Sequence, residues 1–150
     1  MPVSPAVPDR VLPTPDAVTE PYWAAAREGV LELQRCLECE QFTHPPSEWC
    51  RSCGSRNRSF ARVTGTGAVE TFSVVHRTFA PGFADRTPYV VACIGLDEQR
   101  GLRMFGNVLD VPPEEVRIGM RVEVVFEEIG GFGRLPGFRP VRKDGPCASE

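Results

Sequence analysis

The sequence predicts a mainly β protein in which a short N-terminal helix precedes a zinc ribbon and a small five-stranded barrel. Two observations carry this prediction. Four cysteines form two Cys-x-x-Cys pairs within the eighteen residues from Cys36 to Cys53, which is the pattern of a tetrahedral thiolate site. From Val63 onward, short segments rich in β-branched and aromatic residues alternate with turn residues, as in a small all-β domain.

Composition and length limit the classes of protein to consider. The chain has 150 residues, of which 41% are hydrophobic and 25% are charged, as in an ordinary globular domain. No apolar run is long enough to cross a bilayer, and the first fifteen residues contain five prolines and no apolar signal segment. We therefore expect a cytoplasmic protein without membrane contact, in a reducing compartment that favours metal over disulfides. The net charge of −3 argues against nucleic acid as a partner, although sixteen of the seventeen basic residues are arginine.

The N-terminal part divides into an arm and a helix. Residues 1–18 are interpreted as an extended Pro-rich arm, because they contain too few apolar residues to fold alone. Residues 19–34 follow as a helical docking segment, with Thr19 as N-cap, Pro21 in the first turn and Gly29 at the end of the helix. Tyr22 and Trp23 are too large to remain exposed on so short a helix. They pack either on the rest of the chain or on a partner protein.

The zinc ribbon is assigned to residues 35–60. Its predicted metal ligands are the four cysteines of the motif, Cys36, Cys39, Cys50 and Cys53. Four thiolates leave no open position on Zn²⁺, so the site would be structural and its binding energy would be folding energy. Disulfides, a redox thiol pair or a degenerate site are the less favoured alternatives. Gly54 suits the positive-φ position after the second pair, whereas Glu40 would occupy the equivalent position with strain.

The loop between the two cysteine pairs contains His44, followed by Pro45 and Pro46. A loop histidine is favoured over a metal ligand, because the four cysteines already complete the coordination shell. Arginines crowd the second cysteine pair and its exit: Arg51, Arg56, Arg58 and Arg62. A solvated basic face is the favoured interpretation of this cluster, and an anion site for the phosphates of a nucleotide-like ligand is the alternative.

The barrel is assigned to residues 61–143, followed by a tail at 144–150. The expected strands are 67–77, 88–96, 102–109, 121–128 and about 138–141, with a helical turn at 112–116 between the third and the fourth. Five strands with a turn in this place match a small Greek-key barrel of OB type. Cys93 lies inside an apolar run and is expected to be an inert buried thiol, and Cys147 lies in the polar tail.

The connection of residues 76–87 is too long for a tight hairpin and contains Phe79 and Phe83. Apolar residues on a loop either fold back on the core or mark a contact surface. His76, at the end of a strand, is expected to be structural rather than a general base. The sequence contains no glycine-rich phosphate loop, no recognisable Ser/His/Asp order and no His-Glu-x-x-His motif, so it shows no catalytic constellation.

Several motifs resemble one known family. They are Leu33-Gln34-Arg35-Cys36-x-x-Cys39, His44-Pro45-Pro46, Cys50-x-x-Cys53-Gly54-Ser55, residues 65–77, Pro81-Gly82-Phe83, Pro88-Tyr89-Val90-Val91-Ala92 and residues 116–126. The family is the bacterial and archaeal zinc-ribbon/OB-fold family first catalogued as domain of unknown function 35, often called acyl-CoA-associated. The similarity runs from about Tyr22 to Val141, and Glu40, where the family usually has glycine, is the visible departure.

The resemblance implies a rubredoxin-like ribbon, an OB-fold barrel and a role as partner subunit of thiolase-fold enzymes that act on CoA thioesters. Such enzymes include lipid-transfer-protein-like aldolases that shorten steroid side chains, ketothiolase or hydroxymethylglutaryl-CoA synthase assemblies and, for some members, hydratases of hot-dog fold. The catalytic groups in these assemblies belong to the partner.

The chain is therefore expected to be a non-catalytic accessory subunit of a hetero-oligomer in steroid or lipid side-chain degradation. The candidate docking residues are Tyr22, Trp23, Phe79 and Phe83. The candidate acyl-CoA contacts are Arg51, Arg58, Arg77 and His76. The alternatives are a single-stranded nucleic-acid module, which would need a basic groove, and a stand-alone acyl-CoA-binding protein or enzyme.

Overall fold

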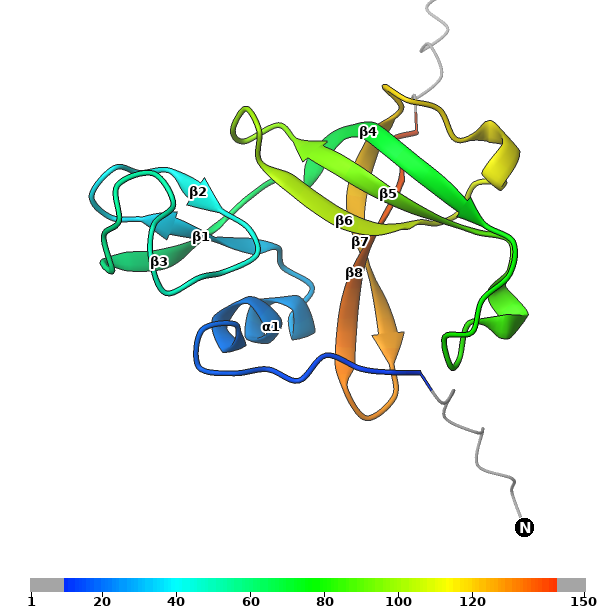
Figure 1. Cartoon of the computed structure of the whole chain (residues 1–150), viewed down its shortest axis with the longest axis horizontal. Coiled ribbons are helices and arrows are strands. Elements are labelled where there is room, and N and C mark those ends of the chain that lie inside the picture. The colour runs from blue at the N-terminus through cyan, green and yellow to red at the C-terminus, as the bar shows by residue number, and fades with distance from the viewer. Residues whose placement is uncertain (1–9, 143–150) are drawn as a thin grey trace, which may run out of the picture.

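In the computed structural model, which describes residues 10–142, a zinc-ribbon sheet and a closed barrel flank one short helix (Figure 1). The ribbon sheet has the strand order β2-β1-β3, and the barrel has the order β4-β5-β6-β8-β7. The predicted mainly β architecture, with one N-terminal helix, a ribbon and a five-stranded barrel, is confirmed.

Helix α1 spans Glu20–Arg27 and ends before Gly29, whose φ of 74° only glycine adopts without strain. Thr19 occupies the N-cap position, but its side chain makes no capping hydrogen bond. Instead, the Asp16 carboxylate accepts hydrogen bonds from the backbone N–H groups of Val18 and Thr19, at 3.0 and 2.8 Å. The arm thus contributes the polar group that organises the start of the helix.

The ribbon strands are β1 (Glu32–Cys36), β2 (Phe42–Thr43) and β3 (Arg58–Arg62), with β1 antiparallel to both neighbours. Gln34 is 2% exposed, and its side-chain amide finds hydrogen-bond partners inside the ribbon. It donates to the carbonyl of Ser47 at 2.9 Å and accepts from the N–H of Ser47 at 3.0 Å. This pair of bonds fixes the loop between the two cysteine pairs.

The barrel strands are β4 (Thr66–Val75), β5 (Tyr89–Leu96), β6 (Arg103–Val108), β7 (Arg121–Ile129) and β8 (Gly133–Pro140). Short 3-10 turns lie at Ala84–Arg86 and Pro113–Glu115. The side chains of Val69, Ile94, Val122 and Phe138 are at most 1% exposed and form the centre of the core. The expected start of the last strand at about residue 138 was wrong. The glycine-rich segment before it is a tight turn at Gly130–Phe132, and strand pairing begins with Ile129 opposite Gly133.

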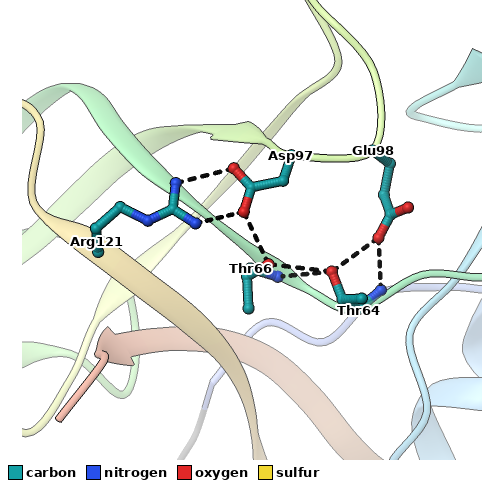
Figure 2. A network of polar contacts seen from close by, with 5 residues as sticks. All are labelled: Thr64, Thr66, Asp97, Glu98 and Arg121. Carbon is teal, nitrogen blue, oxygen red and sulfur yellow. Dashed lines mark hydrogen bonds and ion pairs between the residues drawn. The ribbon is translucent and has the colours of Figure 1, made fainter. Parts of the chain in front are cut away.

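The loop between β5 and β6 joins the barrel to the ribbon. Figure 2 shows the barrel side of this joint, where Arg121 on β7 pairs with Asp97 and the Glu98 carboxylate accepts from the backbone and hydroxyl of Thr64. On the ribbon side, the Gln99 amide accepts from the N–H of Phe42 at 2.8 Å and donates to its carbonyl at 3.2 Å. Three consecutive residues of one loop therefore connect β7, the chain leaving the ribbon and strand β2.

Candidate functional site

The four cysteines converge on one point. Their sulfur atoms all lie within 4.8 Å of one another. Cys36 and Cys53 place their sulfurs 3.6 Å apart, and Cys39 and Cys50 place theirs 3.5 Å apart. Tetrahedral Zn²⁺ with Zn–S bonds of about 2.3 Å requires sulfurs about 3.8 Å apart, whereas a disulfide would bring them to about 2.05 Å. The donor set therefore fits a closed, structural Zn²⁺ site made by Cys36, Cys39, Cys50 and Cys53.

The backbone of both cysteine turns is built for this convergence. In the first turn, the N–H of Glu40 donates to the carbonyl of Cys36 at 3.1 Å, and in the second the N–H of Gly54 donates to that of Cys50 at 2.9 Å. Glu40 has a φ of 62°, the strained conformation expected from the sequence. Arg35 holds Glu40 there, because its guanidinium donates to the Glu40 carbonyl at 3.1 Å and pairs with the Glu40 carboxylate at 3.2 Å.

Backbone N–H groups also prepare one of the thiols for metal. Hydrogen bonds from Cys53 and Ser52 lower the pKa of the Cys50 thiol to about 6, so that its thiolate predominates at neutral pH. Metal binding needs the thiolate form, which the backbone of this turn favours at Cys50.

His44 is a half-buried loop residue and not a member of the thiolate cluster. Its ring packs 5.3 Å from that of Tyr22 on α1, and its Nδ1 is buried with no hydrogen-bond partner within the described residues. Burial, assisted by the positive charge of Arg51, lowers the pKa of His44 to about 4, so the imidazole is neutral at physiological pH. Beside it, α1, the His44 loop, β6 and β8 line a half-open pocket of about 300 Å³.

The two aromatic residues of α1 pack mainly on the chain itself. Tyr22 is 5% exposed, and burial raises the pKa of its phenol. The half-buried Trp23 stacks edge-on against Phe132 at 5.4 Å. Of the two packing alternatives from the sequence, contact with the rest of the chain describes Tyr22, and Trp23 keeps a partly open face.

The connection between β4 and β5 separates its two phenylalanines. Phe79 is fully exposed at the tip, whereas Phe83 packs 5.1 Å from the ring of Tyr89. The guanidinium of Arg10 covers the ring of Phe83 at 4.5 Å and pairs with Glu127 on β7 at 2.8 Å. Arg86 also pairs with Glu127. Arg10, Phe83, Arg86 and Glu127 are called the Glu127 clamp below.

The Glu127 carboxylate in the clamp is half-buried and ionised. Burial opposes ionisation of Glu127, yet the hydrogen bonds from Arg86 and Arg10 hold its pKa below the ordinary value. Gly82 allows the arm to approach, since a Cβ on Gly82 would lie 2.8 Å from the Cβ of Arg10. The arm therefore fixes the base of the loop and leaves Phe79 free.

The candidate acyl-CoA contacts fall into two separate groups. Arg51 and Arg58 belong to the ribbon, and Arg58 also donates to the carbonyl of Glu48. His76 and Arg77 follow the far end of β4, whose ten residues span about 33 Å when extended. Figure 1 shows the ribbon and the far end of β4 on opposite sides of the molecule. The structure does not bring these four side chains to one phosphate group.

Three contributors to these surfaces were not predicted from the sequence. Arg10 contacts Glu127, which is 117 residues away in the sequence, and Gln99 contacts Phe42, which is 57 residues away. No local sequence pattern predicts such contacts. Phe105, 71% exposed on β6, alternates correctly with buried Met104, which is the signal that could have identified it. Among the described residues, no helix has the length and apolar character needed to span a membrane.

Comparisons with known proteins agree with this two-part architecture. Residues 23–57 match the family described as "ChsH2, rubredoxin-like zinc ribbon domain", and residues 61–127 match "ChsH2, C-terminal OB-fold domain". The chain is 34% identical to a DUF35 domain-containing scaffold protein of Pyrococcus furiosus, covering 81% of this chain and 92% of that protein. It is 36% identical to a "probable enoyl-CoA hydratase alpha subunit" of Thermomonospora curvata, covering 79% of this chain but only 36% of that longer protein.

In three dimensions the chain is similar to a chain of the "Ltp2-ChsH2(DUF35) aldolase". The TM-score is 0.78 at 34% sequence identity, and the match covers 86% of this chain and 98% of that chain. The similarity therefore includes the helix, the ribbon and the barrel in one arrangement.

Proposed function

The chain belongs to the DUF35 family of zinc-ribbon and OB-fold proteins, and from this membership we propose that it is a non-catalytic accessory subunit of a thiolase-like enzyme that acts on acyl-CoA thioesters. The partner would be an aldolase of lipid-transfer-protein type or a thiolase, in the degradation of steroid or lipid side chains. The observation that carries the proposal is the similarity, over nearly the whole of that chain, to a chain of the Ltp2-ChsH2(DUF35) aldolase.

The metal centre suits a scaffold role. A four-thiolate Zn²⁺ has no position for water or substrate, so it would stabilise the ribbon rather than take part in chemistry. The surface that it stabilises includes Leu37 and Trp49, which are 55% and 50% exposed next to the cysteine turns. Arg56 stacks on the Trp49 ring at 3.9 Å and keeps that ring in place.

Phe79 is the docking residue that the geometry favours most. A fully exposed phenylalanine is costly in water, and aromatic anchors dominate protein interfaces when a partner covers them. The Glu127 clamp holds the base of its loop, which reduces the conformational entropy that the loop loses on docking. Phe83, half-buried beneath Arg10, contributes by shaping this loop.

One phosphate group of an acyl-CoA could contact either the ribbon arginines, Arg51 and Arg58, or the residues after β4, His76 and Arg77, but not both groups. Arg51 lines a polar pocket of about 260 Å³ together with Gln99 and Arg103, and within residues 10–142 it forms no ion pair with a carboxylate. It is the first residue to test for a phosphate contact, ahead of Arg58, Arg77 and His76. In the assembled complex, Arg51→Gln should raise the KM for the acyl-CoA and leave zinc content unchanged.

A hydratase subunit is a second candidate partner. The relative from Thermomonospora curvata bears that description, and this chain spans about a third of its length. A separate protein, equivalent to the part of that relative that this chain does not match, would then have to bind this chain. The two candidates differ in the fold of the enzyme that co-purifies.

Native mass spectrometry of the tagged protein, purified gently from its own cells, tests the proposal. We expect a stoichiometric complex with a thiolase-fold subunit, one Zn²⁺ per chain and no turnover by the isolated chain. Phe79→Asp should dissociate the complex, while Ile118→Asp, at a residue 72% exposed in the connection between β6 and β7, serves as the matched control. A chain that is always recovered alone would refute the accessory role, and a hydratase would select the second candidate.

A further inference from the structure

The barrel is closed between β6 and β8 by a single pair of residues, Val108 and Phe138. Next to it, the N–H of Leu109 donates to the carbonyl of Phe138 at 2.7 Å. From there toward Arg103, β6 pairs with β5 on one side only. Figure 1 shows β8 running away from β6, with α1 in the angle between them. The barrel is therefore closed at this one point, and among the described residues the other edge of β6, from Arg103 to Asn107, pairs with no strand. This edge is called the seam below.

The alternation of hydrogen bonds identifies the backbone groups at this seam. The N–H of Leu96 donates to the carbonyl of Leu102 at 2.9 Å, which makes these two residues a hydrogen-bonded pair. In an antiparallel ladder such pairs alternate with non-bonded pairs. By the observed register, Phe105 and Asn107 then belong to non-bonded pairs with β5. The N–H and C=O of Phe105 and the N–H of Asn107 point toward the seam, and in the part of the chain from residue 10 to 142 the strand registers give them no partner.

The pocket of about 300 Å³ described above lies at this edge. Its walls are apolar or aromatic side chains of α1, the ribbon loop and β8: Tyr22, Trp23, Pro45, Pro46, Leu135 and Pro136. Pro136 has no N–H, so β8 presents fewer backbone donors to the seam than an ordinary strand. The edge of β6 thus combines free backbone polar groups with an apolar chamber, which is the arrangement that β-strand addition uses.

The pocket carries no net charge. Arg10, the one basic side chain in its wall, is 10% exposed and is neutralised by Glu127 at 2.8 Å. His44 is neutral because its pKa is about 4. A phosphate or carboxylate would find no free cation here, whereas an uncharged apolar group would lose little on entering.

We propose that a short extended segment of the partner subunit, uncharged and apolar, adds as a strand to the free edge of β6 at Phe105 and places one side chain in this pocket. The backbone of the segment would bond the N–H and C=O of Phe105, and its side chains would cover the exposed ring of Phe105. The existence of that partner rests on the proposed function, but the capacity of the edge to bind a strand does not.

The capacity is tested on the isolated zinc-bound chain. The probe is the blocked pentapeptide acetyl-Ala-Val-Ala-Val-Ala-amide, titrated against isotope-labelled protein and followed by amide chemical shifts. We expect saturable shifts confined to β6, β8, α1 and the His44 loop, which together line the pocket. The same peptide with alternate amides N-methylated should bind about tenfold more weakly, the loss that one backbone hydrogen bond produces.

Substitutions at Phe105 separate the backbone from the ring. Phe105→Pro removes the N–H at the seam without removing a bond to β5, and proline is tolerated at such an edge position. It should weaken the pentapeptide at least about tenfold, whereas Phe105→Ala, which keeps the N–H, should weaken it less. Zinc content and circular dichroism show that each variant folds. If Phe105→Pro does not fold, comparing the binding of the unmodified and the N-methylated peptide to wild type still tests the backbone hydrogen bonds.

Each outcome has one meaning. Absence of shifts at Phe105 and Asn107, or equal binding of the methylated peptide, overturns the proposal. Shifts at this site with pantetheine but not with the pentapeptide would assign it to the arm of a CoA thioester and overturn it as well. Dimerisation of the isolated chain that Phe105→Pro abolishes would make a second copy the occupant. A partner that binds wild type and Phe105→Pro equally leaves the accessory role intact and removes the seam from the interface.

Discussion

The contact between Gln99 and Phe42 provides a direct measure of how strongly the ribbon is coupled to the barrel. Replacing Gln99 by methionine keeps the length of the side chain and removes both hydrogen bonds, of 2.8 and 3.2 Å, to the backbone of Phe42. Each bond contributes about 1 kcal/mol net. Because β2 is at the edge of its sheet, water can solvate the N–H and C=O of Phe42 that lose their partner, so no further desolvation cost is added and we expect a total of about 2 kcal/mol.

Hydrogen–deuterium exchange followed by mass spectrometry resolves this effect. A loss of about 2 kcal/mol confined to local opening of the ribbon increases exchange of the β1 and β2 amides by about thirtyfold, with the barrel strands unchanged. Arg100→Ala, at the exposed neighbouring residue, is the matched control and should leave all protection as in wild type. Ribbon amides that remain equally protected in Gln99→Met would refute the coupling by this loop.

Three further predictions concern the metal, the backbone and the clamp. Cys50→Ser should reduce zinc from one ion per chain to none and unfold the ribbon, because such sites contribute about 10–16 kcal/mol; metal analysis showing one retained ion would contradict this. Gly65→Ala should destabilise the protein by about 3 kcal/mol or more in denaturant unfolding, since its φ is 76° and the new Cβ would lie 2.2 Å from Val124. Gly101→Ala, at a φ of 80° with open space around it, isolates the backbone part and should cost only about 1–2 kcal/mol; equal losses would exclude the clash. The depressed pKa of Glu127 means that its ion pairs stabilise the fold above the ordinary value of 4.5, and that this stability is lost as the pH falls through the lower folded value. Unfolding curves between neutral and acid pH should therefore converge for wild type and Glu127→Gln at low pH, and curves that stay parallel would exclude the clamp.

Local patterns in the sequence predicted the parts of the structure that local physics determines. The spacing of the cysteines identified all four members of the thiolate cluster, because two turns must each bring two sulfurs to one point. The strand from Arg121 was predicted from its alternation. The strain at Glu40 was also expected, since a residue in that place of the turn must adopt a positive φ.

The rest depended on contacts between distant parts of the chain. The start of β8 was placed too late because its glycines were interpreted as loop, whereas Gly133 pairs with Ile129 across a tight turn. The fixed position of Arg10 could not be seen in a Pro-rich arm, since it requires Glu127 and Phe83 beneath it. Arg51 and Arg58 lie at one end of the molecule, and His76 and Arg77 lie at the other. This separation depends on the direction in which β4 runs, and the sequence alone did not predict that direction.

The position of α1 against β8 has a consequence for how the protein is made on the ribosome. Trp23 and Arg27 of the helix pack on Phe132, which lies more than one hundred residues later in the chain. The thiolate cluster needs only residues up to Cys53 and the ribbon only those up to Arg62. During synthesis the ribbon can therefore capture its metal early, while the face of the preceding helix that carries Trp23 and Arg27 must wait for the last hairpin. The first helix and the final hairpin would then dock together, as the last step of folding.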